Sequence, residues 1–391
     1  MAVDQNLRVD QASFEHEQTE HSRKSRGSSE AANVFEVGPL DALKEGYRHG
    51  NSFLGYERVS SEGKVIGILA QGHLAESACV DETGPSIALV LDQTPFYGES
   101  GGQVGDLGLI SATGFRFHVT DTKKENDFTL HIGRVIAGSI ALGATVYAEV
   151  DLERRQAIRR AHSATHVLHH ALHIHLGKHA QQAGSKVEPD RLRFDFSNPE
   201  AVGKERLRLI EDTVNDRILL GETIDWSSMP IAEARQLGAM ALFGEKYPEV
   251  VRVVRMGEFS RELCGGTHLA NVAQVGLFKI VAEESVASGT RRITALTGKA
   301  ARELIKEEET ALNAVSSVLK VQPTAVGERV AALLDEIKSL KKQAGQRRSE
   351  TAPKTSSEDL LATAVMMNDT YVIVTVVEYL RISGRRLAQA S

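Results

Sequence analysis

The sequence predicts an α+β multidomain fold: a small β-barrel followed by an α/β two-layer domain, then a helical hairpin or coiled coil. Three observations support this prediction. Short apolar runs alternate with turn residues before residue 150, helices then interleave with mostly antiparallel strands, and residues 299–350 are helix-prone and rich in charge. With 391 residues, 41% apolar and 25% charged, the chain is long enough for two or three cores.

The first third of the chain is expected to hold a polar lead and the barrel. Residues 1–35 are rich in Glu, Gln, Ser and Arg, and we expect them to be disordered or a frayed helix. The β-barrel domain is predicted over residues 36–150. Its strands are expected in the runs KVIGILA, SIALVLD, FRFHVTDT, FTLHIGRV and TVYAEVD. Nearly regular spacing between turn residues is typical of a compact all-β barrel.

The second domain is predicted over residues 151–298. A helical run begins near Leu152, with apolar residues at helical spacing. A helix from about Glu200 to Leu220 and a short helix in IAEARQLGA follow it. The expected strands are RLRFDFS, TIDWSSMP, VVRVVRMG, GLFKIVAEESVASG and TRRITALTG. Helices among mostly antiparallel strands indicate an α+β sandwich.

The last part of the chain is predicted to be helical and then irregular. Residues 299–350 carry apolar residues at helical intervals among many Lys, Glu and Arg, which favours a helical hairpin or short coiled coil. The chain could self-associate through this segment. Residues 351–391 are expected to form a linker and an incomplete C-terminal domain, and linker-like composition already begins in QRRSETAPKTSSEDL.

Charge and cysteine content limit the class of protein. The net charge of −6 excludes a generally basic coat, so any polyanion must be held by local clusters such as Arg154-Arg155 or Arg291-Arg292. Two cysteines, Cys79 and Cys264, argue against a disulfide-rich secreted protein. No window approaches 18 consecutive apolar residues, so no membrane contact is expected. These features predict a cytoplasmic protein.

Two pairs of metal-ligand residues form the most informative pattern. His162 and His166 are four residues apart in the predicted helix, so both imidazoles lie on one face. Cys264 and His268 flank two glycines, which allow a tight turn that aims both side chains at one point. Thiolate and imidazole favour Zn²⁺ over Mg²⁺ or Ca²⁺. We therefore predict a four-ligand zinc site.

The histidines have two other interpretations. A lone helical histidine is more often a surface residue or a satisfied core residue, and His169, His170, His173 and His175 raise that background. Two pairs that can close one tetrahedron favour the metal site over this interpretation. The helical H-x-x-x-H pattern also occurs in zinc peptidases, but Ser163 stands where such an enzyme needs a glutamate base.

A glycine-rich segment, DQTPFYGESGGQVGD, covers residues 92–106. It follows a strand-like run and concentrates glycines where the backbone can turn sharply or approach a ligand closely. It matches neither a P-loop nor a dinucleotide-binding turn. From its residues alone, a tight barrel hairpin and a substrate loop are both open.

Six segments in order resemble the editing region of alanyl-tRNA synthetase, whose core is shared with free-standing alanyl-tRNA editing proteins. They are FYGESGGQVGD, RRAHSATHVLHHAL, KHAQQAGSKVEPDRLRFDFS, ALFGEKY, SRELCGGTH and SGTRRITALTG. VDQASFEHEQTEHSRKSRG resembles the junction before that region, and DLLATAVMMNDTYVIVTV the start of the family's C-terminal domain. Nothing resembles the class II ATP- and alanine-binding motifs, so we expect a synthetase fragment that does not aminoacylate by itself.

The resemblance implies an activity and a partner. It implies hydrolysis of the ester that joins serine, and also glycine, to the acceptor end of tRNA(Ala). An alanine pocket cannot strongly exclude these amino acids, so a second hydrolytic site is the usual remedy. The zinc would be structural, or would orient the ester or a water. The alternative is a catalytically idle tRNA-binding fragment with structural zinc.

The resemblance also implies site residues, each with a plainer alternative. The hydrolytic pocket would use Gln182, Thr165 and Thr267, although a glutamine can simply lie in a loop and a threonine can support a turn. Three charged residues would bind phosphate or form structural ion pairs, namely Arg193, Asp195 and Arg291. The barrel loop near the acceptor end would be shaped by Gly101, Gly102, Gln103 and Asp106.

Overall fold

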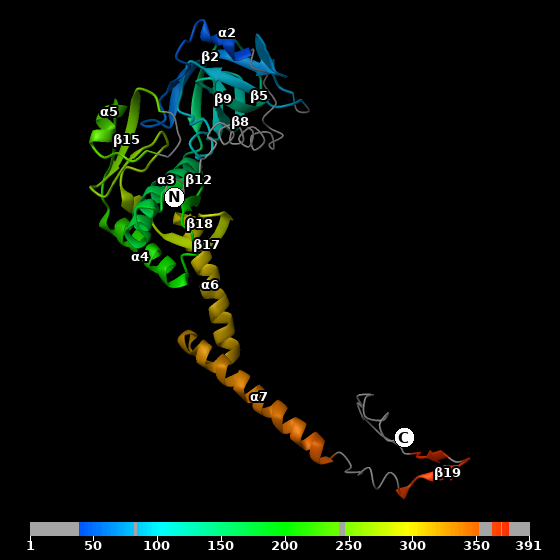
Figure 1. Cartoon of the computed structure of the whole chain (residues 1–391). Coiled ribbons are helices and arrows are strands. Elements are labelled where there is room, and N and C mark those ends of the chain that lie inside the picture. Colours follow the sequence, from blue (N-terminus) through cyan, green and yellow to red (C-terminus); the bar gives the residue numbers. More distant parts are fainter. Residues whose placement is uncertain (1–38, 82–83, 242–246, 352–361, 369, 375–391) are drawn as a thin grey trace, which may run out of the picture. The chain divides into compact units, whose positions relative to one another are not determined.

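The fold is described from a computed structural model of the chain (Figure 1). The structure describes residues 39–81, 84–241, 247–351, 362–368 and 370–374. Two compact units divide the chain, Met1–Glu307 and Glu308–Ser391, and each is described by itself. The polar lead predicted over residues 1–35 lies outside the described residues.

A closed β-barrel begins the larger unit. Among the described residues six antiparallel strands close it, because β11 pairs with both β7 and β2. In barrel order these strands are β2 (Ser60–Ala70), β5 (Ile87–Leu91), β9 (Phe128–Ala137), β8 (Phe115–Glu125), β7 (Gly108–Ala112) and β11 (Thr145–Val150). Shorter strands are β1 (Ser52–Phe53), β3 (His73–Leu74), β4 (Ser77–Cys79), β6 (Gln93–Thr94) and β10 (Ser139–Ala141).

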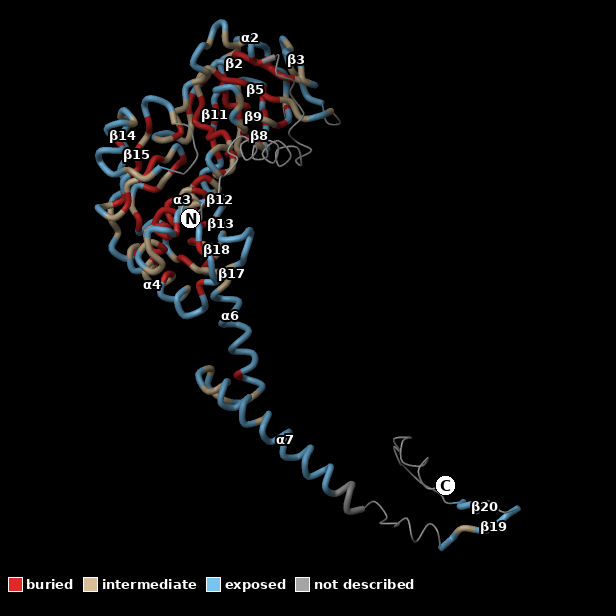
Figure 2. Tube along the Cα trace, viewed as in Figure 1, coloured by how far each residue is buried: buried red, intermediate tan, exposed pale blue. Residues whose placement is uncertain are grey.

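Alternating apolar side chains fill the barrel. Buried and exposed residues alternate along β11 and through the first half of β8, so one side of each strand faces the interior. The interior includes Val65, Leu89 and Phe117, and Figure 2 colours these segments as buried. Helix α2 (Pro39–Lys44) covers a second apolar cluster with Leu40.

The barrel prediction is largely confirmed. The five predicted strands lie in β2, β5, β8, β9 and β11. The sequence does not predict β7, because GLISA is short and interrupts its apolar residues with Gly and Ser. It also misses α2, whose six residues are too few to show a helical period.

Helix α3 (Leu152–Leu176) packs on a second sheet. It begins at the predicted residue, where the Asp151 carboxylate accepts a hydrogen bond from the backbone N–H of Arg154 at 3.0 Å. Gly177, at φ 104°, ends it. The sheet is antiparallel, with the strand order β12 (Gln182–Glu188), β13 (Arg191–Ser197), β18 (Thr290–Thr297) and β17 (Phe278–Ala287).

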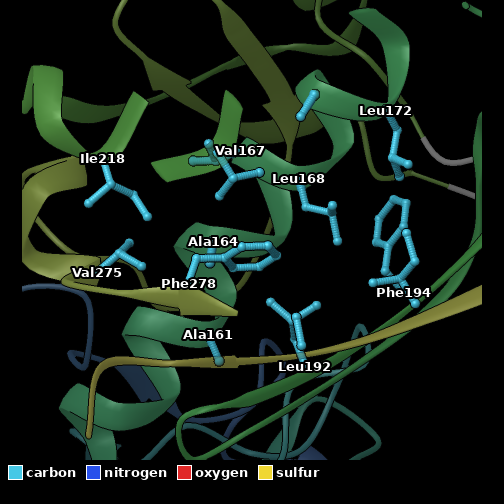
Figure 3. Close-up of a cluster of buried hydrophobic side chains, with 14 of the residues drawn as sticks. Ala161, Ala164, Val167, Leu168, Leu172, Leu192, Phe194, Ile218, Val275 and Phe278 are labelled. Atoms are coloured by element: carbon cyan, nitrogen blue, oxygen red, sulfur yellow. The ribbon is translucent and has the colours of Figure 1, made fainter. Parts of the chain in front are cut away.

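The main core lies between this sheet and the helices α3 and α4 (Lys204–Leu220). Figure 3 shows Ala164 of α3 near Phe278 of the sheet and Leu168 of α3 near Phe194, together with Ile218 of α4. Residues 161–169 of α3 are all buried, so this part of the helix is enclosed on every side. An α+β multidomain fold is therefore confirmed.

A smaller three-stranded antiparallel sheet completes the region around α3. Its strands are β14 (Ile224–Pro230), β15 (Val250–Met256) and β16 (Ser260–Leu263), and α5 (Ile231–Gln236) packs on it. A 3-10 turn, η2 (Val272–Val275), follows and is capped by Asn271. Residues 242–246 lie outside the described residues. Strand β16 ends at Leu263 and so delivers Cys264 at the edge of this sheet.

Several boundaries differ from the expectation. Helix α4 begins at Lys204 instead of Glu200, because Gly203 has a left-handed φ of 82° that a helix cannot continue through. The sequence does not predict β12 or β16. Both carry polar and small residues that satisfy neither a helical nor a clean alternating pattern.

The helix-prone segment is confirmed as helical. It contains α6 (Gly298–Leu319), η3 (Pro323–Ala325) and α7 (Val326–Thr351), and the predicted hairpin or coiled coil stays a prediction. Helix α7 continues beyond Gln346, where linker composition begins, because Gln, Arg and Glu are adequate helix formers. A hairpin of β19 (Val365–Met367) and β20 (Thr370–Val372), which the sequence does not predict, ends the described chain.

Candidate metal centre and adjoining cavity

Four metal-ligand side chains from two distant segments converge. His162 and His166 come from α3, and Cys264 and His268 come from the turn after β16. One candidate ligand atom of each lies within 4.8 Å of the others. The Cys264 Sγ atom lies 3.4 Å from Nε2 of His162 and 3.2 Å from Nε2 of His268. The sequence pattern therefore brings together the four residues that it singles out.

Each imidazole of the cluster uses its Nδ1 atom for a contact with a neighbouring side chain. The three pairs are His162 with Gln103 Oε1 at 2.7 Å, His166 with Glu262 Oε2 at 2.9 Å, and His268 with Ser163 Oγ at 3.2 Å. Such contacts orient the rings and leave Nε2 as the ligand atom. All three rings are thus held with Nε2 available to the centre of the cluster.

The residues present fit a zinc ion. The Nε2 atom of His166 is buried and has no hydrogen-bond partner among the described residues. An unpaired buried nitrogen costs free energy, and a metal ion would satisfy it. Three imidazole nitrogens and one thiolate are a donor set that Zn²⁺ prefers.

The surroundings of Cys264 and His268 shift the pKa of each group toward the protonation state that binds metal. Burial would raise the pKa of the Cys264 thiol, but the imidazoles of His162 and His268 outweigh it and hold that pKa well below its usual range. Burial and the adjacent His162 lower the pKa of His268 to about 3. The thiol is therefore ionised and the His268 imidazole neutral, and these are the states that bind metal.

Glu262 keeps the fourth ligand, His166, protonated in the metal-free chain, so a bound metal would displace the proton on its Nε2 atom. Burial would lower the pKa of His166, but the Glu262 carboxylate raises it to about 10. The same contact lowers the pKa of Glu262 against the opposing effect of burial. Sequence reasoning missed Glu262, although it lies only two residues before Cys264.

The glycine-rich segment carries Gln103 to the cluster. Ser100 and Gln103 form a tight turn through Gly101 and Gly102, which have φ values of 56° and 82°. A Cβ on Gly102 would lie 2.4 Å from the Ser185 carbonyl oxygen, so only glycine fits. The segment is not a hairpin between two barrel strands, because the strands that flank it, β6 and β7, do not pair with each other, and it contacts β12 and α3.

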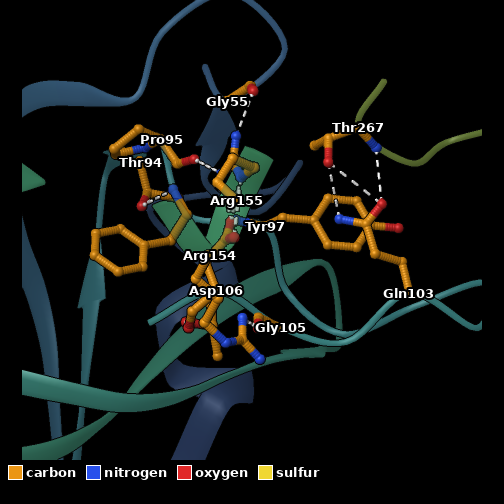
Figure 4. A network of polar contacts seen from close by, with 12 residues as sticks. Gly55, Thr94, Pro95, Tyr97, Gln103, Gly105, Asp106, Arg154, Arg155 and Thr267 are labelled. Atoms are coloured by element: carbon orange, nitrogen blue, oxygen red, sulfur yellow. Dashed lines mark hydrogen bonds and ion pairs between the residues drawn. The ribbon is translucent and has the colours of Figure 1, made fainter. Parts of the chain in front are cut away.

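Gln103 also fixes the cysteine turn. Its Oε1 accepts the backbone N–H of Thr267 at 2.9 Å, and its Nε2 donates to Thr267 Oγ1 at 3.0 Å (Figure 4). Thr267 is fully buried and does not line the cavity described below. The structure thus gives Thr267 the turn-supporting position that the sequence left as its alternative.

Asp106 lies inside the protein. Its carboxylate pairs with Arg155, and the two side chains are 1% and 0% exposed. Arg155 also donates to the carbonyl oxygens of Gly55 and Pro95, at 2.8 and 2.7 Å (Figure 4). Because the Asp106 side chain is almost completely buried, its contacts are made within the protein, where it fastens the glycine-rich loop to α3.

A cavity of about 260 Å³ adjoins the cluster. Two of the three predicted pocket residues line it, Thr165 and Gln182. Thr165 Oγ1 donates to the Ala161 carbonyl at 2.9 Å, which leaves its lone pairs available. Gln182 Nε2 donates a hydrogen bond to Ser185 Oγ at 3.1 Å. The amide oxygen of Gln182 accepts no hydrogen bond from the described residues. His162, His166 and Cys264 line the same cavity.

The predicted phosphate-binding residues lie on the larger sheet and do not line this cavity. Asp195 pairs with Arg292 at 2.6 Å, and Arg291 pairs with Glu283 at 2.7 Å. Arg193 has a buried Nε with no hydrogen-bond partner among the described residues. None of the three predicted residues lines the cavity. Asp195 and Arg291 therefore form ion pairs, the alternative that the sequence left open.

Two family models match the chain. Residues 1–154 match "tRNA synthetases class II (A)", and residues 251–294 match "Threonyl and Alanyl tRNA synthetase second additional domain". The second match contains Cys264 and His268, and the first contains the barrel. These two stretches of the chain are thus similar to domains of class II aminoacyl-tRNA synthetases.

Curated relatives define the family more closely. The alanine–tRNA ligase of Rhodopirellula baltica is 46% identical over 90% of this chain, and that of Acetivibrio thermocellus is 44% identical over 95%. A third, from Shewanella loihica, is 44% identical over 96%. The chain belongs to the alanyl-tRNA synthetase family. It spans only 38% to 42% of the length of these three relatives.

None of the described helices combines the length and apolar composition that crossing a membrane requires.

Proposed function

We propose that this chain hydrolyses the ester between a wrongly attached serine, and also glycine, and the 3′ end of tRNA(Ala). The observation that carries the proposal is the ordered cluster of His162, His166, Cys264 and His268 beside a cavity. Each histidine is held by a side chain from a segment other than its own: His162 by Gln103, His166 by Glu262 and His268 by Ser163. A pre-organised group of this kind is typical of a site for chemistry.

The cavity suits a small amino acid. At about 260 Å³ it lies near the lower end of the range for ligand pockets. Thr165 and Gln182 supply oxygen atoms that can accept a hydrogen bond from the serine hydroxyl. An alanine ester lacks that hydroxyl and would leave these groups without a partner. The chain's own residues thus provide a reason to prefer serine.

The metal site has a defined place in this proposal. His162, His166, Cys264 and His268 would hold Zn²⁺, which when bound supplies positive charge that can polarise an ester carbonyl. Glu262 keeps the His166 ring oriented, and Gln103 does the same for His162. The amide of Gln182 can order a water in the cavity. These residues bind and orient the metal and the substrate, with Cys264 as a thiolate and the three histidines as neutral imidazoles.

A second candidate function follows from the ligand number. Four protein ligands fill a tetrahedral zinc site, as in structural sites, whereas catalytic sites keep one position open. The chain would then bind tRNA without hydrolysing its ester. Both candidate functions assume the same proposed domain limits. These are residues 36–150 for the barrel and residues 151–298 for the zinc-containing domain.

Deacylation of purified substrates separates the two candidates. The full chain, loaded with zinc, is incubated with Ser-tRNA(Ala) and with Ala-tRNA(Ala), and the remaining ester is followed over time. We expect rapid loss of serine and slow loss of alanine, with no loss above buffer for Cys264→Ser. If the zinc-loaded chain releases serine no faster than buffer, the binding-only candidate replaces the hydrolase.

A separate measurement concerns aminoacylation. The expectation that the chain does not activate alanine by itself stays a prediction. Alanine-dependent ATP–pyrophosphate exchange measures it directly, and robust exchange would contradict it.

A further inference from the structure

An arginine is held between two aromatic rings at the edge of the cavity. The guanidinium carbon of Arg252 lies 4.0 Å from the ring centre of Tyr56 and 4.9 Å from that of Trp226. The two rings are 5.5 Å apart. Tyr56 precedes β2, Trp226 lies in β14 and Arg252 lies in β15, so three separate segments build this rim cluster. Arg252 also lines the cavity.

The rim cluster is joined to the turn that carries Cys264. Arg252 Nη1 donates to the carbonyl oxygens of Cys264 and Gly266, each at 2.9 Å. The Tyr56 hydroxyl donates to the carbonyl of Gly265, between them, at 2.8 Å. Three consecutive carbonyls are thereby fixed. The rim cluster is therefore rigid and lies directly beside the candidate metal centre.

The positive charge of the rim cluster has no carboxylate partner within the described residues. Arg252 forms no ion pair there, and neither does Arg159, which donates to the Gly55 carbonyl at 3.3 Å. The Nε atoms of both arginines are buried without a hydrogen-bond partner among those residues. Buried cations are normally paired. In a chain of net charge −6, these two neighbouring cations, which lie near the ionised Cys264 thiol and Asp106 but form an ion pair with neither, are a local complement for an anion.

Burial has a measurable effect on both guanidinium groups. It lowers the pKa of Arg252, and together with the adjacent Arg155 it lowers the pKa of Arg159 to about 10. Both side chains stay charged at neutral pH. A bound phosphate would therefore meet two cations that have already lost much of their hydration.

Aromatic rings connect the protein surface with the cavity. Trp226 is 42% exposed and is the single tryptophan of the chain. From Trp226 the rings continue through Tyr56 to Phe53, 4.8 Å further, and to Tyr97, another 5.8 Å away. Tyr97 lines the cavity. Aromatic and arginine side chains together are the groups that bind the bases and backbone of single-stranded RNA.

We propose that the rim cluster is a subsite for the single-stranded 3′ end of RNA, in which a base stacks on Trp226 and a phosphate lies near Arg252 and Arg159. This inference rests on the proposed function, because the cavity beside the rim cluster would take the esterified amino acid. A duplex does not fit it equally well, since its bases are stacked on one another and offer no free face to the indole.

The trinucleotide CCA is the probe, and the full chain is loaded with zinc. Trp226 is the sole tryptophan, so stacking of a base should quench the intrinsic fluorescence of the protein. We expect saturable quenching by CCA that weakens as salt rises. Inorganic phosphate at the same concentration should not reproduce it. Full quenching by phosphate alone would indicate an anion site and overturn the nucleotide subsite.

Variants test separately the proposed base contact of Trp226 and the proposed phosphate contact of Arg159. With a labelled trinucleotide followed by anisotropy, Trp226→Ala should weaken binding by roughly 5- to 150-fold, and Trp226→Phe should retain most of the affinity. Arg159→Gln should lower the slope of log affinity against log salt by about one. Tyr147→Ala removes an aromatic side chain that is 45% exposed on the barrel strand β11 and should change nothing. Equal affinity for wild type and Trp226→Ala would overturn the proposal.

Binding of the trinucleotide tests the subsite independently of ester hydrolysis. Trinucleotide binding needs no ester, so quenching without deacylation would leave the subsite standing and reject the proposed hydrolase. Deacylation without quenching, and without an effect of Trp226→Ala on binding, would reject the subsite alone. Zinc content of each variant is measured alongside, because loss of metal would reveal damage to the Cys264 turn.

Discussion

The Nδ1 atom of His162 lies 2.7 Å from Oε1 of Gln103, although 59 residues separate them. This hydrogen bond joins the glycine-rich loop of the barrel region to the central helix α3. The same amide oxygen accepts the backbone N–H of Thr267, next to His268. One glutamine therefore controls the position of ligands from both metal-ligand pairs.

Replacing this glutamine should weaken metal binding without removing a ligand. Because partners of this kind orient a ligating ring, we expect Gln103→Ala to lower zinc affinity about 10- to 100-fold. Competition with a chromogenic chelator measures the change. Gln236→Ala, at an exposed position on α5, is the matched control and should bind zinc like wild type. An unchanged affinity for Gln103→Ala would show that His162 needs no such support.

The two cysteines should differ completely in their effect on metal content. Cys264 lies in the cluster, whereas Cys79 is exposed on β4. We expect one zinc per wild-type chain and per Cys79→Ser chain, but less than stoichiometric zinc for Cys264→Ser. A structural zinc can contribute on the order of 10 kcal/mol to folding, so chelation should also lower the thermal midpoint. Full zinc in a Cys264→Ser, His268→Ala double variant would refute this ligand set.

The buried ion pair of Asp106 and Arg155 should be costly to break. Asp106→Ala would leave a fully buried guanidinium without its carboxylate, which typically costs about 3 to 5 kcal/mol. Asp225 and Arg255 form the control pair, because their side chains are 59% and 46% exposed. Asp225→Ala should cost within about 1 kcal/mol. Urea unfolding, followed by circular dichroism, gives both values, and similar losses would contradict the argument.

Stability should fall in mild acid because of one barrel histidine. Burial lowers the pKa of His131 from 6.5 to about 4. The unfolded chain therefore takes up a proton first as the pH drops, so stability that is complete above pH 6.5 is lost progressively down to pH 4. At about 1.4 kcal/mol per pH unit, the loss approaches about 3 kcal/mol. Below pH 4 this contribution should not change further.

A substitution isolates this contribution. His131 contacts Thr94 Oγ1 at 2.7 Å and the Leu89 carbonyl at 2.8 Å, so His131→Gln keeps some hydrogen bonding while removing the titration. Its unfolding free energy should depend less on pH between 6.5 and 4 than that of wild type. His118→Gln, at an exposed position on β8, should follow wild type. Parallel curves for all three proteins would argue against His131.

Much of the fold and of the metal centre follows from periodicity and spacing, and the rest needs tertiary contacts. His162 and His166 were predictable as a pair because a helix fixes the relation between residues four apart. Glu262 and Ser163 were not, since nothing in their sequence neighbourhood shows which ring they will contact. Asp106 is a further case. Its place in a glycine-rich loop predicts a role in shaping that loop, but only burial reveals its ion pair with Arg155.

The choice between serine and alanine should depend on oxygen atoms in the cavity. Thr165 donates to the Ala161 carbonyl and can still accept a bond from the serine hydroxyl. Thr165→Val keeps the shape but removes that oxygen, and Gln182→Ala removes an amide that lines the same cavity. Each lost partner costs about 1 to 3 kcal/mol, or roughly 5- to 150-fold in the serine rate. Deacylation kinetics on both esters give the serine/alanine ratio, which should fall.

Thr213→Val is a closely matched control for the threonine substitution. Thr213 lies in α4 and makes the same type of hydrogen bond, from its hydroxyl to the Leu209 carbonyl four residues earlier, at 2.8 Å. It does not line the cavity, so its replacement should leave the serine/alanine ratio unchanged. All variants must retain stoichiometric zinc, because a loss of metal would lower both rates together. If Thr165→Val and Gln182→Ala keep the wild-type ratio with zinc in place, selectivity for serine arises from groups other than these two.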